Sequence, residues 1–185
     1  MNIKIKKFIA KKNKSKIISL TAYSKSIAKI LDEYCDMVLV GDSMANVLYG
    51  LKSTHKITLQ NIIQHTLSVK KGIKKSLLVV DMPKNSYSNL KKAEKNAKLV
   101  IKSTGCDAIK LESNNKNFKI IENLVKKKIS VMGHIGYTPQ FKKRFKVEGD
   151  TRIKANQLLN EALSIEEAGA FSSCLLYTSP SPRDA

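Results

Sequence analysis

The sequence contains no tryptophan and little glycine or proline, with 8 Gly and 4 Pro among 185 residues. Hydrophobic residues make up 42% of the chain, which is too apolar a composition for a disordered protein. The length is sufficient for one hydrophobic core. We therefore expect one globular domain or part of one.

Cysteine is scarce as well. Cys35, Cys106 and Cys174 are scattered along the chain, and no pair has the spacing of a CxxC motif. Zinc sites and disulfide frameworks need several cysteines at suitable spacing. We expect neither kind of site here.

Long apolar runs are absent too. No stretch of about 18 consecutive apolar residues occurs, so a transmembrane helix is not expected. Residues 1–17 are basic but have neither the apolar core nor the small-residue cleavage site of a signal peptide. These absences predict a cytoplasmic protein without a membrane partner.

Arginine accounts for only 3 of the 34 basic residues, although the formal net charge is +19. A strongly basic chain suggests nucleic-acid binding through phosphate contacts. Proteins that read base sequence favour arginine, however, and single-strand binders interleave basic with aromatic residues. Here the lysines lie mostly in helix-like segments, where solvated faces are expected. A basic nucleic-acid-binding protein therefore stays open as a disfavoured alternative, and we expect no nucleic-acid partner.

Short apolar runs alternate with longer segments of helical periodicity. The runs predict strands at residues 16–23, 37–42, 76–81, 108–112 and 129–136. The intervening segments predict helices at residues 24–34, 58–72, 89–105, 115–128 and 153–169. Thr58 is placed to cap the second helix, and Gly72 to end it. Strands separated by helices, without hairpin signals, predict a parallel α/β sheet.

Phosphate-binding glycine motifs are missing. The turn after the first predicted strand reads Ser24-Lys25-Ser26, and neither GxGxxG nor GxxxxGK[ST] occurs anywhere. Open-sheet nucleotide binders usually carry such a motif. The absence favours a closed (βα)8 barrel over an open doubly wound sheet.

Polar residues occur at the carboxyl ends of the predicted strands. Asp42, Asp81 and Glu112 each end a strand, Lys110 precedes Glu112 by two residues, and His134 lies near the end of the fifth strand. In a parallel barrel these ends form the face that carries the active site. Three converging carboxylates would repel one another without a cation, and oxygen ligands suit Mg²⁺. Lys110 could then hold the carboxylate of an anionic substrate beside the metal.

Each of these residues also has a purely structural interpretation. An Asp at a strand end is often a helix cap or turn residue, and Lys110 could be exposed if its strand had the other phase. His55 and His65, in a predicted loop and helix, are interpreted as surface or structural residues. His134 lies between glycines that permit close backbone approach, which favours a place near the site.

Seven short motifs in order resemble the ketopantoate hydroxymethyltransferase family over residues 3–171. They are TAY (21–23), LVGDS (39–43), VVDMP (79–83), IKLE (109–112), GHIGYTPQ (133–140), KVEG (146–149) and EEAGA (166–170). The resemblance implies a Mg²⁺-dependent (βα)8 TIM barrel of the phosphoenolpyruvate and pyruvate superfamily. About five βα units and the start of the sixth strand are present. It also implies a homodecamer.

The resemblance implies roles for individual residues. Asp42, Asp81 and Glu112 match the family's metal ligands, and Asp42, Ser43, Asp81 and Lys110 match the groups that bind α-ketoisovalerate. His134 is expected as a neighbour of the active site. The implied reaction transfers a hydroxymethyl group from methylene-tetrahydrofolate to a Mg-stabilised enolate, giving ketopantoate in pantothenate synthesis. Lys84 departs from the family, which often has an aromatic residue there.

The end of the chain departs from the family more strongly. In relatives, EAGA leads into a sixth strand that carries the general-base glutamate, whereas here the resemblance stops by Cys174. Residues 174–184 resemble the translation of a transposon-based sequencing adapter. We therefore expect residues 1–173 to be an incomplete barrel domain, residues 174–185 to be a foreign tail, and this fragment to be inactive.

A second enzyme class stays open beside this one. Mg²⁺-dependent lyases and mutases of the same superfamily also act on 2-oxo acids. They usually carry a catalytic cysteine between the fourth and fifth strand ends, and no cysteine lies between Glu112 and His134. The residues thus favour the hydroxymethyltransferase over the lyase or mutase.

Overall fold

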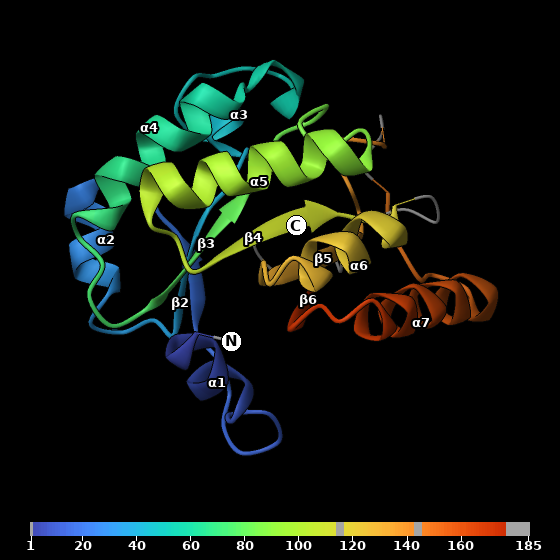
Figure 1. The fold of residues 1–185 in the computed structure, drawn as a ribbon. Helices are drawn as coiled ribbons and strands as arrows, with labels where there is room; N and C mark the ends of the chain where they lie inside the picture. Colours follow the sequence, from blue (N-terminus) through green and yellow to red (C-terminus); the bar gives the residue numbers. More distant parts are fainter. Residues whose placement is uncertain (1, 114–116, 143–145, 177–185) are drawn as a thin grey trace, which may run out of the picture.

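The structure is a computed structural model that describes residues 2–113, 117–142 and 146–176. Its centre is a parallel sheet of six strands in the order β1-β2-β3-β4-β5-β6. The strands are β1 (Ser19–Thr21), β2 (Met37–Val40), β3 (Leu77–Asp81), β4 (Ala108–Glu112), β5 (Val131–Gly136) and β6 (Ser172–Leu176). Strands that follow the chain order and curve as in Figure 1 form part of a barrel.

Apart from the first helix, which precedes the sheet, the helices lie between consecutive strands, and the longer ones cover the outer face of the sheet (Figure 1). They are α1 (Ile3–Ile9), α2 (Lys25–Leu31), α3 (Met44–Val47), η1 (Thr54–Lys56), α4 (Leu59–Lys70), α5 (Leu90–Thr104), α6 (Phe118–Lys126) and α7 (Arg152–Glu167). The predicted strands and helices all exist, with ends shifted by a few residues; the first strand is the most shortened, from residues 16–23 to Ser19–Thr21.

Alternate residues of each strand enter two different apolar clusters. Val38, Val40, Leu78 and Val80 face the helices, whereas Met37, Leu77, Val79, Ala108 and Met132 face the inner side of the sheet. Because both faces are covered, the central strands β3, β4 and β5 are buried throughout. The edge strands differ: all three residues of β1 and three of the five in β6 are exposed.

Helix α1 was missed by the sequence analysis. Its turns are rich in lysine, but Ile5 and Phe8 recur at helical spacing and are buried. They pack against the inner-face residues of β2 and β3, and Phe8 meets Phe171 edge-on with ring centroids 5.8 Å apart. Helix α1 therefore covers the amino-terminal end of the barrel interior and leaves the carboxyl end for the site (Figure 1).

Helix α4 begins and ends where the sequence predicted. Thr58 forms a capping box with Asn61, as its position predicted. Gly72 follows the helix, but it is not among the glycines with positive φ. A Cβ at Gly72 would lie 2.6 Å from the carbonyl oxygen of Lys25. Gly72 thus follows the end of the helix, as predicted, and it is required for close packing against α2.

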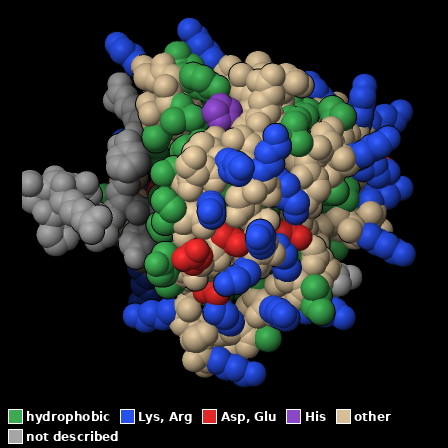
Figure 2. Space-filling model, turned by 90° about the vertical axis from the view of Figure 1, so that its left-hand side faces the viewer, with side chains coloured by type: hydrophobic (Ala, Val, Ile, Leu, Met, Phe, Trp, Pro, Cys, Tyr) green, Lys and Arg blue, Asp and Glu red, His purple; other side chains and the backbone are tan. Residues whose placement is uncertain are grey.

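The surface is dominated by lysine. Figure 2 shows Lys and Arg side chains spread over one face of the molecule instead of gathered into a single stripe. Several pair with a carboxylate one helical turn away, as in Lys98 with Glu94 and Lys126 with Glu122. In the part of the chain that is described, no helix is long and apolar enough to cross a membrane.

Candidate active site

The polar residues at the strand ends gather at one end of the sheet. Asp81 and Glu112 are the last residues of β3 and β4, and Asp42 follows β2 by two residues. Lys110 is in register with Asp81, and His134 of β5 is in register with Glu112. All five side chains are buried. Neighbouring strands are about 4.8 Å apart, so these registers place the side chains in one cluster.

Lys110 forms the central ion pair of this cluster. Its Nζ lies 2.7 Å from Oδ2 of Asp81, and both side chains are at most 6% exposed. Burial alone would lower the pKa of Lys110, but the adjacent Asp81 raises it above the usual value, so the ammonium stays charged. Lys110 and Glu112 both point to the inner side, as strand alternation predicts, and the alternative of an exposed Lys110 was wrong.

Gln140 connects the ends of three strands. Its side chain is fully buried, and its Nε2 donates hydrogen bonds to Oδ2 of Asp42 at 2.9 Å and to the carbonyl of Met82 at 3.0 Å. Its backbone N–H donates to Oε2 of Glu112 at 2.9 Å. The remaining amide oxygen accepts a hydrogen bond from the hydroxyl of Tyr87 at 2.5 Å. One loop residue thereby orients two of the three carboxylates.

The carboxylates hold their protons more tightly than usual. Burial raises the pKa of Asp81 to about 7, with a further increase from Asp42 and an opposing effect from Lys110. Burial and the charges of Asp81 and Asp42 raise the pKa of Glu112 to about 8. Three carboxylates face one ammonium, so the fully ionised cluster has excess negative charge. A cation would relieve this repulsion.

His134 lies beside the cluster as a neutral ring. Its Nδ1 is 3.4 Å from Nζ of Lys110 and 3.8 Å from Oε1 of Glu112. Burial, with the positive charge of Lys110, lowers the pKa of His134 to about 2. Its Nε2 is buried and has no hydrogen-bond partner among the described residues. The ring can therefore take part as a neutral donor or acceptor but not as a cation.

Ser43 and the other two histidines lie further out. The Ser43 hydroxyl is 2.7 Å from the hydroxyl of Tyr23, next to the buried Asp42. His65 is held between the carbonyl of Tyr23 and the hydroxyl of Tyr49, each at 2.8 Å, which confirms its structural interpretation. His55 is exposed near the mouth of the site, where its ring approaches the ammonium of Lys84.

The site fits a Mg²⁺ ion held by two carboxylates better than one held by three. Within the described residues, no three His, Cys, Asp or Glu side chains are arranged to hold a metal together. Asp42 and Asp81 are direct neighbours, since the Asp42 backbone forms a hydrogen bond to the Asp81 carboxylate. Oδ1 of Asp81 is buried without a partner in the described part. Mg²⁺ commonly uses one or two carboxylates and fills its other positions with water or substrate oxygens.

Gln140 and Tyr87 are the residues that sequence reasoning missed. Both lie in loops after strands, where spacing along the chain gives no indication of which side chains meet. Gln140 does fall within the motif GHIGYTPQ (133–140), so its presence there was the available signal. Its 98-residue separation from Asp42 could only be bridged by the fold.

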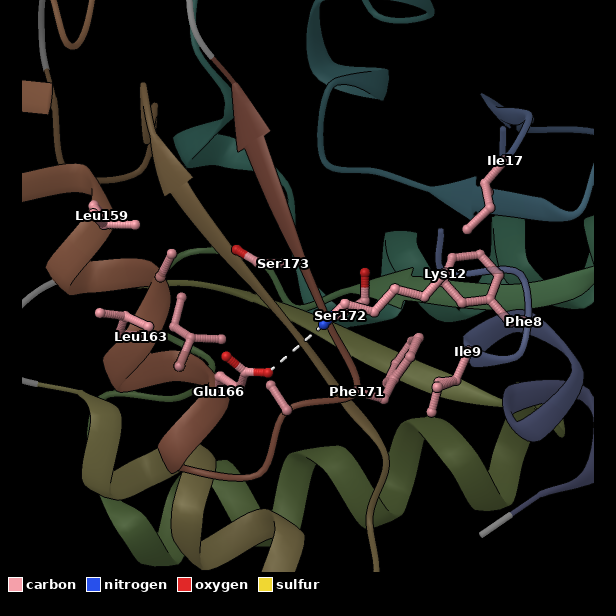
Figure 3. A pocket seen from close by; sticks show the side chains of 13 residues that line it. Phe8, Ile9, Lys12, Ile17, Leu159, Leu163, Glu166, Phe171, Ser172 and Ser173 are labelled. Carbon is pink, nitrogen blue, oxygen red and sulfur yellow. Dashed lines mark ion pairs between the residues drawn. The ribbon is translucent and has the colours of Figure 1, made fainter. Parts of the chain in front are cut away.

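A mainly apolar cavity lies elsewhere in the molecule. It has a volume of about 440 Å³ and is lined by α1, α7 and the start of β6, at the end of the sheet opposite the cluster. Figure 3 shows Phe8, Ile9, Leu163 and Phe171 around it, with Lys12 and Glu166 forming an ion pair of 3.9 Å across it. Its lining is mainly apolar, and it contains none of the clustered polar residues.

Comparison with known proteins identifies the family. A family model described as Ketopantoate hydroxymethyltransferase matches residues 2–180. The chain is 55% identical over 172 residues to the 3-methyl-2-oxobutanoate hydroxymethyltransferase of Pelagibacter ubique, a match that covers 93% of this chain and 67% of the relative. The chain belongs to the ketopantoate hydroxymethyltransferase family.

A further relative and two solved structures agree with this result. The hydroxymethyltransferase of Clostridioides difficile is 47% identical, with 88% of this chain and 61% of that protein covered. A crystal structure of phosphonopyruvate hydrolase with oxalate and Mg²⁺ matches with a TM-score of 0.71 at 10% identity, covering 98% of this chain and 65% of the other.

The second solved structure is 2,3-dimethylmalate lyase, described as a member of the PEP mutase/isocitrate lyase superfamily. It matches with a TM-score of 0.67 at 13% identity, covering 95% of this chain and 64% of the other. At such low identity these structures establish the fold alone. They confirm the expected partial (βα)8 barrel. This chain spans about two thirds of the length of the proteins it matches.

Proposed function

We propose that this chain forms the metal and keto-acid side of an enzyme that transfers a hydroxymethyl group from methylene-tetrahydrofolate to 3-methyl-2-oxobutanoate. The observation that carries the proposal is the buried cluster of Asp42, Asp81 and Lys110 at the carboxyl end of the barrel. It combines hard oxygen ligands with a cation, which is the pair of features that a 2-oxo acid bound to Mg²⁺ requires. Family membership supports the same reaction.

Asp42 and Asp81 would hold Mg²⁺, and Glu112 would contribute negative charge beside them. When bound, the ion would act as a Lewis acid toward the keto oxygen of the substrate. Lys110 would pair with the substrate carboxylate, and Ser43 would donate a hydrogen bond to it. A base removes the proton on the carbon next to the ketone. Addition of water breaks the two C–N bonds of the folate's methylene bridge and releases tetrahydrofolate and formaldehyde. The substrate carbon then bonds to the formaldehyde carbon, and the formaldehyde oxygen takes up a proton to become the new hydroxyl group. The product is ketopantoate, so the reaction belongs to pantothenate synthesis.

No general base is assigned within this chain. His134 is a neutral ring beside the ammonium of Lys110, and we do not assign it as the base. The nearest carboxylates, Glu112 and Asp81, belong to the proposed metal site. We propose that the base is a glutamate in the third of the barrel that the relatives have beyond this match. We also propose that residues 1–173 are the enzyme domain, that residues 174–185 are a foreign tail, and that the 185-residue chain alone is inactive. We also propose that the complete enzyme is a homodecamer in the cytoplasm.

A completed barrel tests this function. Residues 1–173 are fused to the remaining third of the Pelagibacter ubique relative, and deuterium exchange at the third carbon of 3-methyl-2-oxobutanoate is followed by NMR. We expect Mg²⁺-dependent exchange in the fusion and none in the 185-residue chain. Asp81→Asn should reduce the exchange rate by about a hundredfold or more, a loss comparable to removing one charge-stabilising group from an active site.

Asp150→Asn is the matched control, because Asp150 is an exposed carboxylate in a one-turn ion pair with Lys154. It should leave the exchange rate unchanged. Exchange that proceeds equally well with Asp81→Asn, or in the presence of EDTA, would remove the basis for the proposed site.

A further inference from the structure

A second cavity opens beside the candidate active site. It has a volume of about 180 Å³ and lies between the loop after β3 and the start of α6. Its lining combines four polar side chains with two aromatic rings and one aliphatic side chain: Lys84, Asn85, Ser88, Asn117, Tyr87, Phe141 and Ile120. A cavity with aromatic walls, two amides and one cation is suited to a flat ring that carries an amide and an anionic group.

Lys84 is the cation of this cavity. Its side chain is half-buried, and its Nζ lies 3.2 Å from Nε2 and 3.3 Å from Nδ1 of His55. In the described ranges, no carboxylate lies within 4.0 Å of Lys84, whereas Lys110 in the site has Asp81 as its partner. A partly desolvated ammonium next to an imidazole gains from an anionic partner, and a ligand can provide one.

The cavity is connected to the site through Tyr87. The Tyr87 ring lines the cavity, and its hydroxyl donates to Gln140, which in turn holds Asp42. Asn117 is oriented at the same wall by a hydrogen bond of 2.8 Å from its Nδ2 to the carbonyl of Glu112. A ligand in this cavity would therefore lie next to a keto acid bound at Asp42, Asp81 and Lys110.

We propose that this cavity binds the aminobenzoyl-glutamate part of the one-carbon donor, with Lys84 pairing with a glutamate carboxylate. Tyr87 and Phe141 provide surfaces for the benzoyl ring, and Asn85 and Asn117 provide amide partners for the benzoyl amide. This assignment rests on the proposed function, since it assumes a folate cosubstrate. It makes Lys84 a determinant of cosubstrate affinity.

Direct binding of p-aminobenzoyl-L-glutamate to the 185-residue chain tests the assignment. Titration calorimetry, or two-dimensional NMR of the labelled protein, gives the dissociation constant. We expect Lys84→Gln to weaken binding about tenfold, as loss of one charge-assisted contact predicts. Lys91→Gln is the matched control, because Lys91 is an exposed lysine on α5 outside the cavity. The neutral analogue p-aminobenzamide should bind equally to the parent chain and to Lys84→Gln.

A second measurement separates this inference from the proposed function. In the completed barrel, Lys84→Gln should raise the KM for methylene-tetrahydrofolate about tenfold while leaving the KM for 3-methyl-2-oxobutanoate and the keto-acid deuterium exchange unchanged. Binding of p-aminobenzoyl-L-glutamate that depends on Lys84, together with a completed barrel that lacks transferase activity, would uphold the cavity and reject the proposed function. Equal affinity of the parent chain and Lys84→Gln, or an unchanged folate KM in an active enzyme, would overturn the assignment of the cavity.

Discussion

Replacing Gln140 by leucine should destabilise the protein strongly. The substitution keeps a side chain of similar volume but removes the amide group that forms hydrogen bonds with Asp42, Met82 and Tyr87. A buried hydrogen bond to a charged group contributes about 1.5–3 kcal/mol, and each buried polar group left without a partner costs about 1–3 kcal/mol. Because the leucine partly offsets these losses by apolar burial, we expect a net decrease of about 3–5 kcal/mol in the free energy of unfolding.

Urea denaturation followed by circular dichroism measures this decrease. Gln64→Leu is the control, since Gln64 is exposed on α4 and its replacement should change stability by less than about 0.5 kcal/mol. Gln140→Leu should also weaken Mg²⁺ binding, because Asp42 loses the donor that orients it. A Gln140→Leu protein within about 1 kcal/mol of the parent would refute the claim that this residue connects the strand ends.

Two further substitutions test how the sheet is supported. Asp32 accepts hydrogen bonds from the backbone N–H groups of Lys74, Lys75 and Ser76 at 2.8–3.1 Å; although burial acts to raise its pKa, these bonds lower it overall. Its ionised form therefore stabilises the fold above the unfolded pKa of about 3.9, and this contribution is lost as pH falls through the lower folded pKa. Asp32→Asn should lower the free energy of unfolding by about 2 kcal/mol at pH 7 and by little at pH 2. Urea denaturation at the two pH values measures this difference, and equal decreases at both would contradict the prediction. Gly72→Ala should lower the free energy of unfolding by about 1–3 kcal/mol, because the new Cβ would lie 2.6 Å and 2.8 Å from backbone atoms of Lys25 and Lys29. An unchanged melting temperature would show that α2 does not pack against Gly72, at the end of α4, as closely as described.

The sequence predicted the parts of the fold that have strong local signals. The runs at residues 76–81 and 108–112 place apolar residues at most positions and charged ones toward the strand ends, and they became the buried strands β3 and β4. Asp81, Lys110 and Glu112 could be assigned to one face because strand alternation and parallel pairing determine where their side chains point. The apolar pattern therefore accounts for both the sheet and the core of the candidate site.

Contacts between distant loops could not be predicted in the same way. Gln140 meets Asp42 and Tyr87 only because the chain after β5 folds back over the ends of β2 and β3. Helix α1 has just two buried residues, Ile5 and Phe8, among its lysines, which is too weak a periodicity to identify. The role of Gly72 likewise depends on the approach of α2, a tertiary contact with no local signal.

The most direct test of the account is keto-acid deuterium exchange in the completed barrel. Exchange that requires both Mg²⁺ and the carboxylate of Asp81, and that is unaffected by Asp150→Asn, is the result predicted from the buried cluster at the strand ends. Exchange that persists without Mg²⁺ or with Asp81→Asn would contradict the central claim that this cluster binds and activates the substrate.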